Sequence, residues 1–243
     1  MDALSVDNLT TSYGKRAVLH GVSLRIAAGQ FVGLVGVNGA GKTTLVKSIL
    51  GLCRIDDGTI HLFGQSSGDE SARSRVSYLP ERFAPPSYCT CRDFLRLSHR
   101  LYDVKYDAAT VANILERLDL DPVVLDKPVK QLSKGMTQKL GLAACFLSRK
   151  PFLILDEPMS GLDPIARHHV KQMLLDAKQR GTTVLMSSHA LADVEVLCNS
   201  MTVIHQGQVV FDDTVQAFRE SFPDGDLDDS FMKLVKAGAP IAE

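Results

Sequence analysis

The stretch Gly36-Val37-Asn38-Gly39-Ala40-Gly41-Lys42-Thr43 decides the fold, because it consists of a glycine, four residues and then Gly-Lys-Thr. The apolar run FVGLVG before it (residues 31–36) is typical of a strand buried on both faces, and TTLVKSILGL after it predicts a helix closing around Gly51. Glycines let backbone N–H groups and a helix N-terminus approach phosphates closely. We expect Lys42 to reach the β- and γ-phosphates and the Thr43 hydroxyl to ligate Mg²⁺. The alternative, a glycine-rich turn that matches by chance, is disfavoured by the flanking strand and helix.

A second motif, Phe152-Leu153-Ile154-Leu155-Asp156-Glu157, places two carboxylates at the end of an apolar strand. Open α/β sheets bind their ligands at the carboxyl ends of strands. Asp156 is therefore expected to hold Mg²⁺, and Glu157 to polarise an attacking water. On its own this Asp-Glu pair would be explained equally well as a helix cap; the phosphate loop favours the catalytic interpretation.

His189 ends a third apolar run, TTVLMSSH, and we expect its side chain to face the same crevice and contact the γ-phosphate. A single histidine at a strand end is more often a cap or a surface residue. Only its combination with the other two motifs makes His189 a candidate catalytic residue.

Composition limits the partners that the chain can have. The 243 residues carry 27 basic and 28 acidic side chains and a net charge of -1, so we expect no nucleic-acid partner. The five cysteines are too scattered for a disulfide framework and are expected to be reduced thiols. We find neither a signal peptide nor an apolar run of the ~20 residues that span a bilayer. If the protein works at a membrane, we expect another chain to supply the membrane part.

The order of patterns along the chain predicts an α/β core interrupted by helices. Two predicted strands, residues 3–12 and 17–26, flank a turn at Tyr13-Gly14-Lys15, and apolar and polar residues alternate in the first of them. Helical periodicity dominates residues 82–145. Strands and helices alternate again from PFLILDEP onward. A hairpin is expected to turn at Gln206-Gly207. The tail from about residue 215 is expected to be helical, with a loop at PDGD (223–226).

The motif Leu132-Ser133-Lys134-Gly135-Met136, just before the aspartate strand, is similar to the Leu-Ser-Gly-Gly-Gln signature of ATP-binding cassette (ABC) ATPases. The resemblance covers nearly the whole chain. It implies that Ser133 and the N–H of Gly135, at a helix N-terminus, bind the γ-phosphate held by an opposite subunit.

The resemblance implies further roles for residues at matching positions. Tyr13 matches the aromatic residue that stacks on adenine, although a simple turn tyrosine is the alternative. Ser160-Gly161-Leu162-Asp163 matches the loop that links the two sites of a dimer, and His189 matches the switch histidine. Glu81 stands where the family usually has a metal-contacting glutamine, and we expect it to contact Mg²⁺. The implied nucleotide-binding set is Tyr13, Gly36, Val37, Asn38, Gly39, Ala40, Gly41, Lys42, Thr43, Thr44, Ser133 and Gly135.

The resemblance implies a phosphate-loop NTPase fold of the α/β class. Its parts are a mixed sheet, an N-terminal antiparallel β region and an inserted α-helical subdomain. We expect one domain over residues 1–243, with a RecA-like core (1–81 and 146–214), a helical subdomain (about 82–145) and a C-terminal helical tail (215–243).

The implied function is ATP hydrolysis, with ATP and Mg²⁺, by a homodimer joined through its ATP sites. Departures from the family pattern at Glu81, Lys134 and Met136, and the tail Leu227–Leu234, resemble exporter subunits that pair with a separate integral membrane permease. The segment Pro85-Pro86-Ser87-Tyr88 is expected to contact that permease, with a simple loop as the alternative. The expected location is the cytoplasm, peripheral on the cytoplasmic face of the inner or plasma membrane. A cassette ATPase without a transport role, such as one for iron–sulfur cluster assembly, is the alternative.

Overall fold

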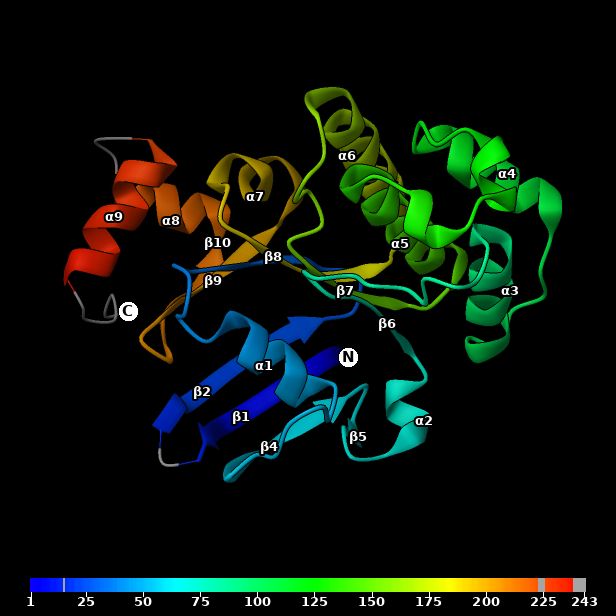
Figure 1. Ribbon diagram of the computed structural model, residues 1–243. Coiled ribbons are helices and arrows are strands. Elements are labelled where there is room, and N and C mark those ends of the chain that lie inside the picture. The colour runs from blue at the N-terminus through cyan, green and yellow to red at the C-terminus, as the bar shows by residue number, and fades with distance from the viewer. Residues whose placement is uncertain (15, 223–225, 238–243) are drawn as a thin grey trace.

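The computed structural model describes residues 1–14, 16–222 and 226–237, and it contains two β-sheets flanked by helices (Figure 1). The predicted turn at Tyr13-Gly14-Lys15 includes Lys15, which lies outside the described residues. The same holds for residues 223–225 of the predicted PDGD loop. The strands, in chain order, are β1 (Asp2–Tyr13), β2 (Arg16–Ala27), β3 (Phe31–Val35), β4 (Asp57–Leu62), β5 (Gln65–Ser66), β6 (Val76–Leu79), β7 (Phe152–Asp156), β8 (Thr183–Ser188), β9 (Ser200–His205) and β10 (Gln208–Thr214).

The helices surround the larger sheet, and several of them begin at a residue whose side chain caps the helix N-terminus. Thr90 caps α3 with a reciprocal capping box, and the side chains of Asp107 and Asp163 cap α4 and α6. The α-helices are α1 (Lys42–Ile49), α2 (Glu70–Arg73), α3 (Cys91–Leu101), α4 (Ala108–Arg117), α5 (Lys134–Leu147), α6 (Pro164–Gln179), α7 (Leu191–Leu197), α8 (Val215–Ser221) and α9 (Leu227–Ala237), and short 3₁₀ helices span Pro122–Asp126 and Val129–Gln131.

The larger sheet is mixed. Its six strands run in the order β10-β9-β3-β8-β7-β6, all pairs being parallel except β10 with β9. The other sheet is antiparallel, in the order β2-β1-β4-β5. Both features confirm the predicted α/β fold with a mixed sheet and an N-terminal antiparallel region. The hairpin expected at Gln206-Gly207 joins β9 to β10.

The two faces of the mixed sheet pack into two apolar cores, which explains the uninterrupted apolar runs. In β7, Leu153 and Leu155 face one core, whereas Phe152 and Ile154 face the other. Helices α5, α6 and α7 cover the first face, while α1 and the antiparallel sheet cover the second (Figure 1). Strands buried on both faces cannot alternate between apolar and polar residues, so their sequences read as continuous hydrophobic segments.

Helices α3 and α4 lie at one end of the molecule, beyond β6, and both contact α5 (Figure 1). The boundary expected at residue 145 falls inside α5, which continues to Leu147. The subdomain limits therefore stay a prediction. None of the helices in the described ranges has the length and apolar character needed to cross a membrane.

Candidate functional site

Three neighbouring parallel strands end at one edge of the mixed sheet and deliver the three predicted motifs there. Strand β8 lies between β3 and β7, and the last paired residues are Val35 with Ser188 and Asp156 with Ser187. The phosphate loop leaves β3 directly after Val35, Glu157 follows β7, and His189 follows β8. Motifs more than a hundred residues apart in sequence are thus adjacent in space.

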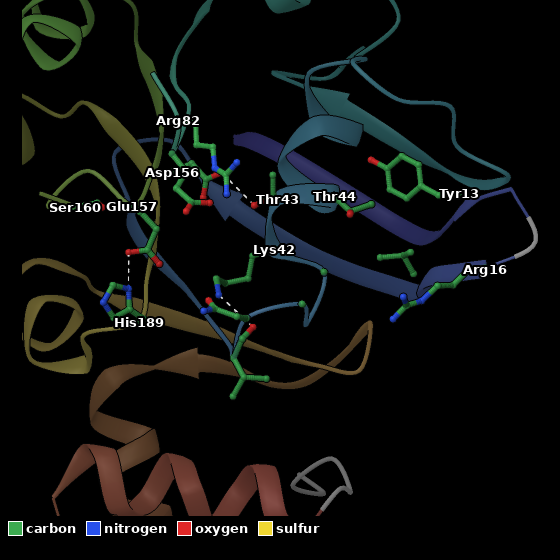
Figure 2. Close-up of a pocket in the computed structure, with 16 residues that line it drawn as sticks. Tyr13, Arg16, Lys42, Thr43, Thr44, Arg82, Asp156, Glu157, Ser160 and His189 are labelled. Atoms are coloured by element: carbon green, nitrogen blue, oxygen red, sulfur yellow. Dashed lines mark hydrogen bonds and ion pairs between the residues drawn. The ribbon is translucent and has the colours of Figure 1, made fainter. Parts of the chain in front are cut away.

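These strand ends border a cavity of about 650 Å³ (Figure 2). The predicted site residues that line it are Tyr13, Val37, Asn38, Gly39, Gly41, Lys42, Thr43, Thr44, Glu81, Asp156, Glu157 and His189. Tyr13 and Arg16 lie at the end of the cavity away from Glu157 and His189, with Lys42 and Thr43 between (Figure 2). The cavity is therefore elongated, with an aromatic side chain at one end and carboxylates at the other.

Four predicted binding residues do not line this cavity: Gly36, Ala40, Ser133 and Gly135. Gly36 and Ala40 belong to the loop itself, and their backbone carbonyls accept hydrogen bonds from Lys42 Nζ and from the N–H of Gly207, respectively. Ser133 instead caps α5, its Oγ accepting a hydrogen bond from the N–H of Met136 at 3.2 Å. The signature-like motif thus stands apart from the phosphate loop of its own chain.

The ammonium of Lys42 is folded back onto the loop that it is expected to serve. Its Nζ donates to the carbonyl of Gly36 at 2.5 Å and lies 3.4 Å from the carbonyl of Val37. Burial lowers the pKa of Lys42 below its ordinary value, and the nearby negative charges of Glu157, Asp156 and Glu81 oppose that shift. The carboxylates thus favour the charged form of Lys42. An anionic ligand in the cavity would bind this charged side chain directly.

Asp156 is held where it can share a cation with Thr43. The Thr43 hydroxyl donates to Asp156 Oδ2 at 3.3 Å, while the Ser187 hydroxyl donates to Asp156 Oδ1. Hydroxyl and carboxylate oxygens are the donors that Mg²⁺ prefers, and Glu81 lines the same cavity. The donor set fits a magnesium ion that takes its other ligands from water and phosphate. Among the described residues no cluster of three or more His, Cys, Asp or Glu forms a metal site by itself.

The pKa of Tyr78 is also raised, by burial and in part by the negative charge of Asp156. Burial, with the negative charges of Asp156 and Glu81, raises the pKa of Tyr78 to about 12. Tyr78 therefore stays neutral beside the carboxylates.

Glu157 points its carboxylate into the cavity and contacts His189. Glu157 Oε2 lies 2.8 Å from His189 Nδ1, and the side chains are 13% and 69% exposed, respectively (Figure 2). Because an ionised carboxylate only accepts hydrogen bonds, the Nδ1 atom carries the proton in this contact. Nε2 of the exposed imidazole remains able to meet a ligand.

The backbone of Glu157 has an unusual conformation. Its φ of 51° lies in the left-handed region, which non-glycine residues rarely adopt. Its N–H donates to the hydroxyl of Ser187 at 2.9 Å. Such strained conformations cluster at functional sites and persist where the surroundings hold them in place.

Sequence reasoning missed several residues of the site. Arg16, Val18 and Arg82 line the cavity, and Ser160, predicted only as part of a linking loop, lines it as well. Ser187 was missed because its role depends on the register between β7 and β8. The two arginines follow Lys15 and Glu81 directly, but no spacing rule marks them as ligands.

The site has the parts that a nucleoside triphosphate requires. Backbone N–H groups, a helix N-terminus and Lys42 suit phosphates, and the carboxylates suit a divalent cation and a water.

Comparisons with known proteins support this assignment. Residues 19–160 match the family described as ABC transporter. The chain is 36% identical to the ABC-type transporter ATP-binding protein EcsA of Bacillus subtilis (strain 168), covering 98% of this chain and 99% of that protein. It is 37% identical to the Nod factor export ATP-binding protein I of Burkholderia orbicola (strain AU 1054), over 88% and 71% of the two chains.

A solved structure entitled "Structure of ATP binding subunit of ABC transporter" superposes with a TM-score of 0.87 at 32% identity, over 96% of this chain and 99% of that one. Sequence and fold therefore agree from one end of the chain to the other. Because these similarities span almost the entire length, the protein belongs to the ABC transporter family, as one of its ATP-binding, ATP-hydrolysing subunits.

Proposed function

We propose that two copies of this chain enclose two ATP molecules, and that closing and reopening of this dimer powers export through a separate integral membrane permease. The observation that carries the proposal is the separation of the two phosphate-binding elements. The phosphate loop borders the cavity, whereas Ser133 and Gly135, at the N-terminus of α5, do not. A second copy supplies them to the open side of the site.

Within one site, the residues of this chain divide the chemistry. Lys42 leaves its bond with the Gly36 carbonyl and binds the β- and γ-phosphates. Glu157 accepts a hydrogen bond from the attacking water and polarises it. His189, already bonded to Glu157 through Nδ1, orients the γ-phosphate through Nε2. Tyr13 stacks on the adenine at the far end of the cavity.

Mg²⁺ fits the oxygen atoms of Thr43 and Asp156, with Glu81 beside them. When bound, the ion neutralises charge that develops on the phosphate oxygens. Replacing Asp156 by Asn is expected to abolish the magnesium dependence of ATP binding, which titrations with and without EDTA measure.

Export is supported by the similarity to the Nod factor export ATP-binding protein I of Burkholderia orbicola. The chain works at the cytoplasmic face of the inner or plasma membrane and binds no nucleic acid. Where a six-span membrane protein is encoded beside its gene, co-expression of the two proteins tests this part. A complex whose ATPase rate exceeds that of the isolated chain is expected, and failure of the two proteins to associate contradicts the transport role.

The dimer is tested with Glu157→Gln, which keeps the shape of the side chain but removes the negative charge that polarises water. This variant is expected to bind ATP without turnover and to elute as a dimer from size-exclusion chromatography with ATP, and as a monomer without it. Glu116→Gln, on an exposed position of α4, is the matched control and retains turnover. Strictly monomeric elution of the ATP-bound Glu157 variant at high concentration would refute the sandwich.

A further inference from the structure

We infer that Gln138 is a positioning residue that aims the carboxylate of Glu157 by holding the main chain on its C-terminal side. The inference rests on the role proposed above for Glu157. Gln138 lies in α5, away from the cavity lining, and no sequence motif marks it as part of the site.

The hydrogen bonds of Gln138 are the first observation. Its Nε2 donates to the carbonyl of Pro158 at 3.1 Å and lies 3.4 Å from the carbonyl of Glu157. The residue is only 5% exposed, so these contacts form away from water. A buried carbonyl that loses its donor costs about 1–3 kcal/mol, which makes the amide a strong constraint on the main chain here.

The strained backbone of Glu157 is the second observation. A φ of 51° costs a non-glycine residue about 1–2 kcal/mol, so this conformation relaxes unless neighbouring groups prevent it. The Ser187 hydroxyl accepts the N–H of Glu157 on one side, and Gln138 binds its carbonyl on the other. The N–H of Ser160 also bonds to this carbonyl, closing a turn. Both main-chain polar groups of Glu157, its N–H and its carbonyl, are thus held by hydrogen bonds.

The position of Gln138 in α5 gives this contact a further consequence. The helix begins at Lys134, so Gln138 lies about one turn from Ser133 and Gly135. A Cβ atom added at Gly135 would lie 3.1 Å from the carbonyl of Gly161, which shows that the first turn of α5 packs against the loop after Glu157. A displacement of this helix end therefore reaches the main chain that carries Glu157.

The alternative explanation is purely structural: Gln138 fills space in the core, and its contacts serve only to give its own buried amide hydrogen-bond partners. The two explanations differ in what they predict for kinetics. If Gln138 only packs, its loss lowers stability. If it positions Glu157, its loss displaces the Glu157 carboxylate and lowers the rate of the chemical step, without changing how the phosphate loop holds ATP. Misplacement of a catalytic group by about 1 Å can reduce a rate about 100-fold.

The test uses Gln138→Met, which keeps the volume and removes the donor, and Gln138→Glu, which keeps the shape and replaces the NH₂ group by an acceptor. Gln172→Met, on an exposed position of α6, is the matched control. For each full-length variant, kcat and KM for ATP hydrolysis are measured with the dissociation constant of a fluorescent ATP analogue and the thermal unfolding midpoint.

We expect kcat to fall at least about 10-fold in both Gln138 variants, with KM and the nucleotide affinity unchanged within about twofold. The control keeps the wild-type kcat. If Gln138→Met unfolds below the assay temperature, the Glu variant decides the question. A folded variant with wild-type kcat, or one in which only KM rises, overturns the inference. A wild-type protein and control without any turnover would instead refute the proposed function itself.

Discussion

The Gln206-Gly207 turn between β9 and β10 supports the phosphate loop from outside the cavity, and Gly207→Ala tests how much. The N–H of Gly207 donates to the carbonyl of Ala40 in the loop at 2.9 Å, and its own carbonyl accepts from the N–H of His20 at 2.9 Å. Its φ is 77°, and an added Cβ would lie 2.1 Å from the carbonyl oxygen of Val18. No real Cβ contact is that short, so the turn must move away from β2.

The magnitude follows from these contacts. Alanine in the left-handed region costs about 1 kcal/mol relative to glycine. Moving the turn breaks the two backbone hydrogen bonds, each of which contributes about 1 kcal/mol. We therefore expect Gly207→Ala to lower the free energy of unfolding by about 3 kcal/mol. ATP affinity should fall as well, because the carbonyl of Ala40 loses its donor and the loop is released.

Gly181→Ala supplies the matched control. Gly181 has a φ of 75°, and an added Cβ meets no atom within 4 Å, so only the cost of the left-handed backbone, about 1 kcal/mol, applies. Equilibrium urea unfolding gives both free energies, and titration with a fluorescent ATP analogue gives both affinities. Equal destabilisation of the two variants within about 0.5 kcal/mol, or wild-type ATP affinity in Gly207→Ala, would refute the reasoning.

Four further predictions concern the site and the core. Lys42→Met removes the charged hydrogen bond from Lys42 to the phosphates, and such a bond contributes about 1.5–3 kcal/mol. The ATP dissociation constant should therefore rise about 10- to 100-fold. An unchanged constant in the nucleotide titration would contradict the role of Lys42. Phe152→Ala removes a fully buried ring from the sheet core and should cost about 3–5 kcal/mol in urea unfolding, whereas a loss below about 1 kcal/mol would contradict the packing described. Burial raises the pKa of Cys145 to about 11 and that of Cys198 to about 12, above the ordinary value of 9.0. Because the folded state holds these protons more tightly, the free energy of unfolding should fall as the pH rises above 9.0 towards those values. At pH 8, a thiol reagent followed by mass spectrometry should label the partly exposed Cys53 and Cys89 first, and fast labelling of Cys145 or Cys198 in the native protein would count against the structure.

Much of the site was predictable because its key residues follow one another along the chain. The phosphate loop and the pair Asp156-Glu157 each combine an apolar strand with polar residues at its end. Local physics ties such a pattern to its geometry, since a strand buried on both faces must be apolar and a phosphate loop must carry glycines. The pattern alone also placed His189 at the end of its strand.

Other residues of the site could not be found in this way, because contacts distant in sequence bring them in. Arg16 and Arg82 reach the cavity from β2 and from the segment after β6. Ser187 bonds to Asp156 only because β8 pairs with β7 in one particular register. Gln138 meets Pro158 only because α5 packs against the loop after β7.

The sequence by itself determined the loop Gly36–Thr43, the carboxylates after β7 and the α/β character of the core, since each depends on neighbours along the chain. Only the tertiary structure decided the strand order β10-β9-β3-β8-β7-β6, and with it which strand ends meet at the cavity. It also separated Ser133 and Gly135 from the loop of their own chain. The physical reason is that strand pairing and helix packing are set by the burial of whole apolar faces, which no single segment of sequence specifies.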